Sequence, residues 1–400
     1  LFFDPDLNSL VQEVKHSFKQ CVCFGTAPPT ALSYERLLEA QDEAEPLFEK
    51  QVCLSSAHII MYTAGTTGKP KGAVLLQAAG FFNALNLNIA LDLSESDRNL
   101  LTLPMFHIGG IGLFTLPMLY KGGTIVIQKT FDPVVSLNLF EKEKISLFFG
   151  VPAMFLSMIQ HPEFNCEKFN TARIVMCGGA PLPVSLVNQY NDQGIILAQG
   201  FGMSEAGPSI ATLDRKNAIK KAGSVGRPVF HMDAKIVDCD LKRLAPGEVG
   251  ELLIKGPNLF REYWNRADAT KEAFAGDWFQ TGDLAYMDGD NDLYIVERKK
   301  DMYISGGENV YPAEVENILY EIQEIAETAV IGVKDEKWGE TGLAVVVLKP
   351  GTKISEADIL GYLGKKLAKF KIPKKFVFQD QLPRNAAGKV LKNELKTQFS

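Results

Sequence analysis

Short apolar runs alternate with amphipathic segments through the first 230 residues of the chain. The runs have the composition of buried strands, and the clearest of them are residues 124–128, 145–151, 173–179 and 194–202. Helical patterns at 133–144 and 181–192 separate them, each with a proline early, where its missing N–H costs nothing. This alternation predicts an α/β fold with largely parallel sheet, in which ligands bind beyond the carboxyl ends of the strands.

The pattern changes near residue 222. From there to residue 299, short strand patterns are separated by Gly, Pro and Asp turns, which predicts a small β-barrel-like subdomain. Beyond residue 300 the pattern is mixed α+β, with a helix predicted over 312–319 and another, capped by Ser355 and Asp358, up to Lys369. We therefore expect an N-terminal domain over residues 1–299, with its β-rich subdomain at about 222–299, and a small mobile C-terminal lid domain over 301–400.

The composition is ordinary for a globular protein, with 46% apolar and 22% charged residues in 400. No run of about 18 apolar residues is present, so no transmembrane helix is expected. The six cysteines are scattered, which favours reduced thiols in a cytoplasmic protein over a disulfide framework or a zinc site. The chain opens LFFDPD without Met and with a strand pattern already under way, so a truncated or processed N-terminus is expected.

Charge is distributed unevenly along the chain. The formal net charge of −6 argues against a general nucleic-acid binder. Residues 365–396, however, hold ten basic side chains against two acidic ones. This C-terminal tract favours an anionic ligand or an anionic surface, including a peripheral membrane contact, although a solvated lysine-rich helix face explains any single lysine equally well.

The stretch MYTAGTTGKPKG at residues 61–72 is the most informative segment. Its glycines allow close approach of the backbone to a ligand, and successive N–H groups in such a turn form a nest for anions. Three threonine hydroxyls and two lysines add donors and positive charge. The spacing is too short for a P-loop, and Pro70 stands where Ser or Thr should bind magnesium. We interpret the segment as a polyphosphate-binding loop; the alternative is a Gly/Thr-rich surface turn.

Other motifs give this loop its context. They are LPMFH at 103–107, GGAP at 178–181, QGFGMSE at 199–205, GELLIKG at 250–256, WFQTGD at 278–283, ERKKDMYISGGENVYPAEVE at 297–316 and LPRNAAGK at 382–389. In this order they resemble the acyl-adenylate-forming superfamily, from about residue 57 to the C-terminus. The family's loop usually carries Ser where this chain has Ala64, a change expected to tune phosphate binding. Family members also carry a longer segment before the loop, so about the first third of the usual N-terminal domain is expected to be absent.

The resemblance implies cofactors and ligand-contacting residues. It implies ATP, Mg²⁺ bound by Glu205 with Thr63, and coenzyme A as a substrate. Phe201 and the backbone of residues 179–181 would sandwich adenine, Asp283 would accept hydrogen bonds from both ribose hydroxyls, and Arg298 would support the ribose or phosphate. The residues expected to contact ATP or AMP are Thr63, Gly65, Thr66, Thr67, Gly68, Lys71, Gly179, Ala180, Pro181, Gly200, Phe201, Gly202, Met203, Ser204, Asp283, Arg298 and Lys389.

Catalytic roles follow from the same resemblance. Lys389, at the end of the N-A-A-G-K loop, would bridge the carboxylate and the α-phosphate, with Glu205 and Thr63 as the other catalytic residues. Lys300 would be the hinge on which the C-terminal domain turns. After that turn, Gly306 and Gly307 would line a narrow tunnel for coenzyme A, flanked by Trp338.

The acyl pocket is expected around His107, Gly110 and Phe201, with further aromatic residues at 81, 82 and 114. It lacks an evident arginine for a second carboxylate. The interpretation is therefore an ATP-dependent acyl-CoA ligase acting on a fatty acid. Aromatic acids and o-succinylbenzoate stay open as substrates. A stand-alone adenylation domain that loads a carrier protein and a truncated, non-catalytic binder are the other readings, and the oligomeric state is open.

Overall fold

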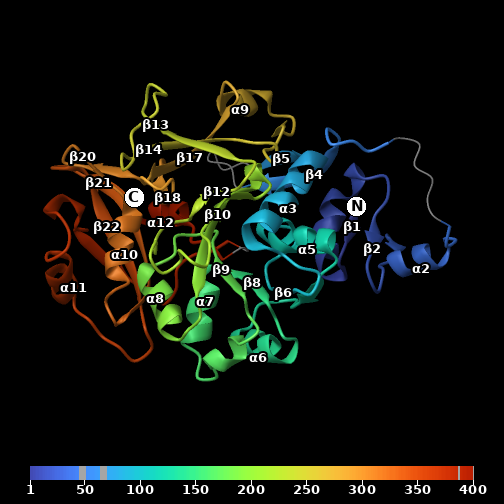
Figure 1. Cartoon of the computed structure of the whole chain (residues 1–400), viewed down its shortest axis with the longest axis horizontal. Coiled ribbons are helices and arrows are strands. Elements are labelled where there is room, and N and C mark those ends of the chain that lie inside the picture. Colours follow the sequence, from blue (N-terminus) through green and yellow to red (C-terminus); the bar gives the residue numbers. More distant parts are fainter. Residues whose placement is uncertain (45–50, 64–69, 386–387, 400) are drawn as a thin grey trace. The chain divides into compact units, whose positions relative to one another are not determined.

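The computed structural model describes residues 1–44, 51–63, 70–385 and 388–399 (Figure 1). The chain forms two compact units, Leu1–Val52 and Cys53–Ser400. In the first unit three short parallel strands lie in the order β1 (Phe2–Phe3), β2 (Val22–Cys23) and β3 (Leu32–Ser33), with helices α1 (Asn8–Val14) and α2 (Tyr34–Glu39). The strand predicted at the start of the chain is thereby confirmed.

The second unit is built on a seven-stranded sheet. Its order is β12 (Arg227–Pro228), β11 (Ser209–Thr212), β10 (Leu197–Gly202), β9 (Ile174–Cys177), β8 (Leu147–Gly150), β6 (Arg98–Leu101) and β7 (Thr124–Ile127). The pairs from β7 to β10 are parallel, and β11 and β12 are antiparallel to their neighbours. All four strands that the apolar runs predict are present in this sheet, and the α/β fold class is confirmed.

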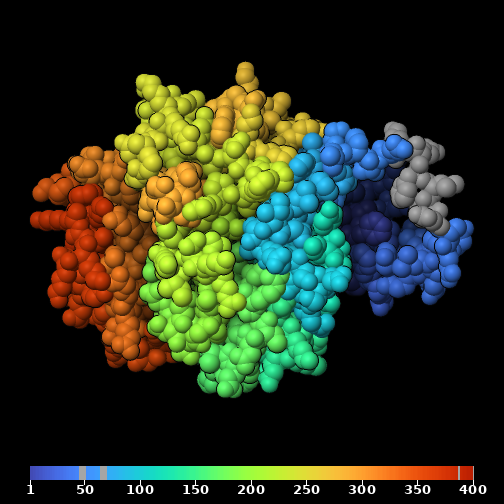
Figure 2. Space-filling model, viewed as in Figure 1, coloured from blue at the N-terminus to red at the C-terminus, as the bar shows by residue number. Residues whose placement is uncertain are grey.

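Helices connect these strands, as the alternating pattern predicts. They are α3 (Gln77–Leu91), α4 (Ile108–Gly110), α5 (Leu116–Lys121), α6 (Pro133–Lys142), α7 (Pro152–Ile159) and α8 (Val184–Asp192). Helix α3 packs against α5, both in the cyan part of the surface in Figure 2. Each described helix is too short or too polar to cross a membrane.

Helix α8 begins at Val184, whereas the sequence pattern predicted a start at 181. The prolines explain the difference, because a residue that precedes proline is disfavoured in the helical region. Pro183 itself is extended, with ψ 132°, and acts as the N-cap residue. Residues 181–183 therefore remain in a loop that a ligand can reach.

The phosphate-loop candidate follows a strand, and the next element is a second strand of a separate sheet. Strands β4 (Ala57–Thr63) and β5 (Lys71–Leu76) pair antiparallel, and β15 (Glu262–Tyr263) pairs with β5 to complete a three-stranded sheet. Two strands joined by so few residues can return only antiparallel, because a parallel crossover needs a dozen residues or more. In the seven-stranded sheet, GGAP at 178–181 follows β9, and QGFGMSE at 199–205 begins in β10 and continues beyond it.

The β-rich subdomain is a five-stranded antiparallel sheet, which agrees with the predicted meander. It contains β13 (Asp233–Val237), β14 (Gly250–Lys255), β16 (Phe274–Ala275), β17 (Trp278–Met287) and β18 (Leu293–Arg298), with helix α9 (Ala267–Glu272). Gly226 joins this sheet to the seven-stranded one, because the Leu293 N–H donates to the Gly226 carbonyl at 2.8 Å. The two sheets share a core that includes Ile210, Leu252, Phe260 and Phe279.

The C-terminal segment has the predicted α+β composition. Its sheet contains β19 (Tyr303–Ser305), β20 (Glu308–Val310), β21 (Ile325–Asp335), β22 (Gly339–Leu348) and β23 (Lys375–Phe378), with helices α10 (Pro312–Leu319), α11 (Glu356–Leu363) and α12 (Lys392–Phe399). Helix α10 has its predicted bounds, and Ser355 and Asp358 form the predicted capping box of α11. Helix α11 ends at Leu363 instead of Lys369, because Gly364 is a poor residue for a helix interior.

Replacing Gly226 should destabilise the junction of the two sheets. Its φ is +82°, and an added Cβ would lie 2.0 Å from the Thr212 carbonyl oxygen. Gly247 is a matched control, because its φ is +87° and nothing lies within 4 Å of an added Cβ. Left-handed backbone costs an alanine about 1–2 kcal/mol at either site, and overpacking adds about 1–3 kcal/mol at Gly226 alone. In thermal unfolding, Gly226→Ala should therefore have a clearly lower midpoint than Gly247→Ala; equal midpoints would contradict the packing argument.

Candidate active site

One cavity of about 1220 Å³ in the second unit is lined by most of the predicted site residues. Its walls come from strands β4 and β5, from the loops after β9 and β10, from β17 and β18, and from residues 384–385 and 388–393. The predicted residues that line it are Thr63, Lys71, His107, Gly179, Ala180, Pro181, Gly200, Phe201, Gly202, Met203, Ser204, Glu205, Asp283, Arg298, Lys300 and Lys389. Gly65, Thr66, Thr67 and Gly68 lie outside the described residues.

Asp283 and Arg298 form an ion pair at the cavity wall. The register of β17 and β18 places them opposite each other, and Arg298 Nε lies 2.7 Å from Asp283 Oδ1. Asp283 is only 2% exposed, and its Oδ2 has no hydrogen-bond partner among the described residues. Burial raises the pKa of this carboxyl to about 6, against the opposing effect of Arg298 and Lys389. An unpartnered carboxylate oxygen at a cavity wall is suited to accept a ligand hydroxyl.

Glu205 is held by a tyrosine that the sequence motifs did not reveal. Tyr263, on β15, donates its hydroxyl to Glu205 Oε1 at 2.9 Å, and Lys71 Nζ lies 5.1 Å from the centre of the Tyr263 ring. Burial and the neighbouring Glu205 raise the pKa of Tyr263 far above its ordinary value, so its hydroxyl stays a donor. The tyrosine thus links the hairpin to the turn that carries Glu205. A lone Tyr in R-E-Y-W carries no motif signal, and only the β15–β5 pairing brings it here.

Lys389 faces the cavity from the C-terminal segment. Its backbone N–H donates to Asn385 Oδ1 at 2.9 Å, and Arg384 Nη1 donates to the Gly388 carbonyl at 2.6 Å, so the turn before it is closed on itself. Its side chain is exposed to the cavity, where the surrounding protein displaces most bulk water. This desolvation lowers the pKa of Lys389 to about 8, with Arg298 acting in the same direction and Asp283 against it.

His107 forms part of the cavity wall near Lys389. Its Nδ1 accepts the Gly109 N–H at 3.1 Å and caps α4. Burial, and then the charge of Lys389, lower the pKa of His107 below its ordinary value, so the imidazole is neutral near pH 7. The apolar residues Leu113, Phe149, Val151 and Met176 line the same cavity.

Two glycines in the adenine-type motifs are required by close backbone contacts. A Cβ on Gly178 would lie 2.6 Å from the Gly200 carbonyl oxygen, and one on Gly202 would lie 2.1 Å from that of Pro208. The first contact draws the loop after β9 against β10, and the second closes the turn between β10 and β11. Phe201 directly precedes Gly202 on β10, and its side chain stays partly exposed to the cavity.

Seven predicted residues of the described part of the chain do not line the cavity: Gly110, Gly306, Gly307, Trp338, and the aromatic residues Phe81, Phe82 and Phe114, which were expected in the acyl pocket. Gly110 is buried, and a Cβ added to it would lie 2.1 Å from the Pro104 carbonyl oxygen. Only glycine therefore allows α4 to pack this closely against the chain behind the cavity wall. Gly306, Gly307 and Trp338 lie together elsewhere: the Gly306 N–H donates to the Trp338 carbonyl at 2.9 Å, and a Cβ on Gly306 would meet the indole ring at 2.4 Å. Gly306 therefore contacts Trp338, while the role of Gly306, Gly307 and Trp338 toward coenzyme A stays a prediction.

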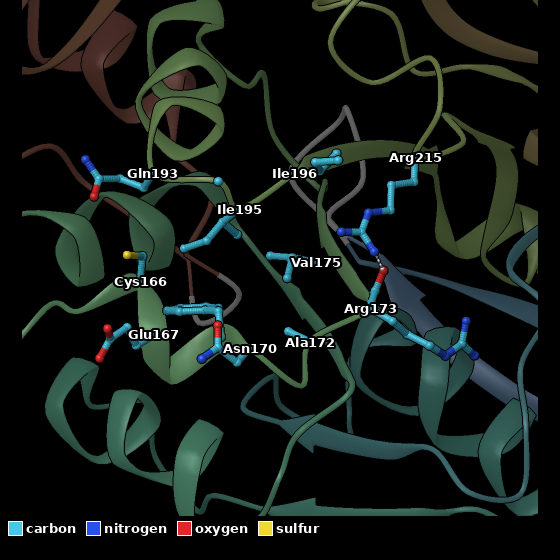
Figure 3. A pocket seen from close by; sticks show the side chains of 12 residues that line it. Cys166, Glu167, Asn170, Ala172, Arg173, Val175, Gln193, Ile195, Ile196 and Arg215 are labelled. Atoms are coloured by element: carbon cyan, nitrogen blue, oxygen red, sulfur yellow. Dashed lines mark hydrogen bonds between the residues drawn. The ribbon is translucent and has the colours of Figure 1, made fainter.

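A smaller depression of about 290 Å³ lies beside β9 and the turn at 193–196 (Figure 3). Arg215 Nη1 donates to the Arg173 backbone carbonyl there at 3.3 Å, and the Arg173 guanidinium is engaged by Asp97. None of the predicted site residues lines this depression. The large cavity is therefore the candidate active site.

Comparison with known proteins agrees with this geometry. The family described as AMP-binding enzyme matches residues 5–264, and its C-terminal domain matches residues 314–389. Feruloyl-CoA synthase of an Amycolatopsis species is 42% identical over 362 residues, which are 90% of this chain and 73% of that protein. Indoleacetate–CoA ligase of Aromatoleum aromaticum is 41% identical over 398 residues, 99% of this chain and 78% of that protein.

Solved structures give the same result. ATP-bound MatB from Rhodopseudomonas palustris superposes with a TM-score of 0.90 at 30% identity, over 100% of this chain and 78% of that one. O-succinylbenzoate coenzyme A synthetase (MenE) from Bacillus subtilis, in complex with ATP and magnesium, superposes with a TM-score of 0.85 at 33% identity, over 99% of this chain and 78% of that one. The chain therefore belongs to the family of AMP-binding enzymes, and within it to the ATP-dependent, AMP-forming acid–thiol ligases.

Proposed function

We propose that this ligase activates a monocarboxylic acid with an apolar, aromatic body, first as an acyl-adenylate and then as a coenzyme A thioester. One observation carries the proposal: Lys389 faces the Asp283–Arg298 pair and His107 inside a single cavity that also holds Glu205 and an apolar wall. A nucleotide, a carboxylate and a cation can meet in such a site. The other readings, a non-catalytic binder in particular, give no reason for a desolvated lysine at this place.

The nucleotide would be held by groups of matching chemistry. Asp283 would accept the ribose hydroxyls, since Oδ2 is unpartnered and Arg298 fixes Oδ1. Phe201 and residues 179–181 would contact the flat faces of adenine. Lys71, held over the Tyr263 ring, would offset the charge of the phosphates together with the loop that follows Thr63. Preorganised donors of this kind stabilise developing charge without reorganisation during the reaction.

Glu205 and Thr63 fit a magnesium ion by donor type, because a carboxylate and a hydroxyl are the hard oxygen ligands that this cation prefers. Both residues line the cavity, and the Tyr263 hydroxyl orients the Glu205 carboxylate at 2.9 Å. When bound, the ion would neutralise charge on the phosphates of ATP. We assign these two residues to that role.

The chemistry needs two displacements because a carboxylate has no good leaving group. In the first, a carboxylate oxygen of the acid attacks the α-phosphorus of ATP, the bond to the bridging oxygen breaks, and pyrophosphate leaves. The Lys389 ammonium would hold the carboxylate against the α-phosphate while negative charge builds up. In the second, the thiolate of coenzyme A attacks the acyl carbon, and AMP leaves with the electron pair of the anhydride C–O bond.

The second displacement requires room for a thiol where Lys389 stands. We propose Lys300 as the hinge that allows the C-terminal segment to move, and Gly306, Gly307 and Trp338 as the residues that would then meet coenzyme A. Lys300 lines the cavity at the junction of β18 and the C-terminal sheet, which supports the hinge. We likewise propose that the N-terminal domain ends at residue 299 and the C-terminal domain begins at residue 301.

The choice of acid rests on the cavity wall and on the relatives. Leu113, Phe149, Val151 and Met176 give an apolar surface. The names of two relatives at 41–42% identity specify aromatic acids. A fatty acid is the second candidate, favoured by 40% identity over 341 residues to long-chain-fatty-acid–CoA ligase FadD13 of Mycobacterium tuberculosis.

A panel of acids tests the assignment. We expect ATP–pyrophosphate exchange and CoA-dependent AMP release with aryl-substituted monocarboxylic acids, and slower turnover with medium- and long-chain fatty acids. Omission of coenzyme A should leave the exchange intact and stop the net reaction. Exchange with none of the acids would refute the ligase proposal, and a preference for fatty acids would refute the aromatic assignment alone.

Removal of the Lys389 ammonium separates the two displacements. Lys389→Ala should slow adenylation on the order of 10²–10³-fold, since it removes one preorganised charge. Thioester formation from supplied acyl-adenylate should stay within about twofold of the wild-type rate, because that step does not use the ammonium. Both rates can be measured by rapid quench. A similar loss in both would show that Lys389 supports the fold rather than the first step.

The pH dependence of adenylation should be bell-shaped. Asp283, with its pKa raised to about 6, is protonated below that pH and loses the charge that accepts the ribose. Lys389, with its pKa lowered to about 8, is neutral above that pH and loses its attraction for both anions. The first-step kcat/KM should therefore fall below about pH 6 and above about pH 8. Lys389→Arg should remove the alkaline limb, because a guanidinium does not deprotonate; an unchanged limb would assign it to another group.

A further inference from the structure

Three charged side chains are buried together beneath the Lys389 turn. They come from three elements: Glu297 from β18, Glu316 from α10 and Lys392 from the start of α12. Lys392 Nζ lies 2.7 Å from Glu316 Oε1 and 3.7 Å from Glu297 Oε2. Glu297 and Glu316 are 6% and 7% exposed. The proposed mechanism uses none of the three.

Glu297 also binds backbone on both sides of residue 300. Its Oε1 accepts the N–H of Arg298, and its Oε2 accepts the N–H of Ala313, each at 2.9 Å. Ala313 is in the first turn of α10, where unpaired N–H groups and the helix dipole favour a negative charge. The carboxylate that precedes Arg298 on β18 therefore fixes the start of α10.

Lys392 connects the start of α12 to Glu297 on β18 and to Glu316 on α10. It follows Lys389 by three residues, so its position sets where the turn carrying Lys389 ends. Burial alone would lower the pKa of Lys392, but Glu316 and Glu297 raise it above its ordinary value, so it stays charged. One helical turn later Lys396 makes a second tie, with Nζ 3.6 Å from Asp301 and 3.3 Å from the Lys300 carbonyl.

Stability alone does not account for this cluster. Removing charges from water is costly, and well-packed apolar residues of similar volume often stabilise a protein as well or better. What the ions add is geometry, because each charge must lie close to its partner, at 2.7 Å for Lys392 and Glu316. Reaction rates are sensitive to geometry, since a displacement of about 1 Å can cost on the order of 10²-fold.

We propose that Glu297 and Lys392 are positioning residues that hold the Lys389 turn in register with the Asp283–Arg298 pair. Glu297 and Arg298 are adjacent on β18, so the strand that presents Arg298 to the cavity also anchors α10 and α12. This inference rests on the proposed role of Lys389 in adenylation. It adds that the ammonium is held in place by an ion cluster that lines the same cavity but takes no part in the two displacements.

Glu297→Gln tests the proposal, because the amide keeps the size and one acceptor while losing the charge. We expect adenylation about tenfold slower, an unchanged KM for ATP, and thioester formation from supplied acyl-adenylate within twofold of wild type. Glu321→Gln is the matched control. Glu321 pairs with Lys366 and Tyr362, both within the C-terminal segment, and its loss should leave both rates unchanged.

Two further variants distinguish positioning from a structural role. In Glu297→Gln combined with Lys389→Ala, adenylation should be no slower than in Lys389→Ala alone, since Glu297 acts through that lysine. Lys392→Arg should keep most of the rate, because it retains the charge. Equal loss in both half-reactions of Glu297→Gln, or additive loss in the double variant, would overturn the proposal. A wild-type protein without pyrophosphate exchange would instead refute the proposed function.

Discussion

The buried pair of Asp283 and Arg298 is the interaction on which the site depends. Antiparallel register places the two residues opposite each other, and the 2.7 Å contact fixes one carboxylate oxygen while the other stays unpartnered. A carboxylate at 2% exposure would be costly alone, so the guanidinium and the Lys389 ammonium are what make its ionised form accessible. Desolvation raises the pKa of Asp283 and lowers that of Lys389, and the attraction between the two charges opposes both shifts.

The cavity exists because separate sheets end at one place. The seven-stranded sheet supplies the loops after β9 and β10, the hairpin β4–β5 supplies Thr63 and Lys71, and the β-rich sheet supplies Asp283 and Arg298. Gly178 permits the close approach of the loop after β9 to β10, and Gly202 permits the tight turn between β10 and β11. Tyr263 then joins two of the sheets by a single hydroxyl, which is how the Glu205 carboxylate is oriented.

Sequence reasoning failed where local signals met a tertiary constraint. The start of α8 and the end of α11 were misplaced by a few residues, because the prolines at 181–183 and Gly364 outweigh the apolar periodicity. The placement of β4 and β5 in a separate three-stranded sheet has no local signal, since an apolar run has the same pattern in either sheet. Gly110 was expected at the cavity surface, yet its role is to let α4 pack against the chain behind it.

The amino-acid order alone determined the family motifs, the strand–helix alternation and the capped helices of the C-terminal segment, while the resemblance of those motifs to a known family implied most residues of the cavity. It could do so because periodicity, caps and glycine spacing are encoded within a few consecutive residues. The tertiary structure decided the rest. Tyr263 binds Glu205, desolvation shifts the pKa values of Asp283 and Lys389, and Lys392 pairs with Glu297 and Glu316. These contacts join residues far apart in the chain. Their energies depend on distance and desolvation, which no local pattern records.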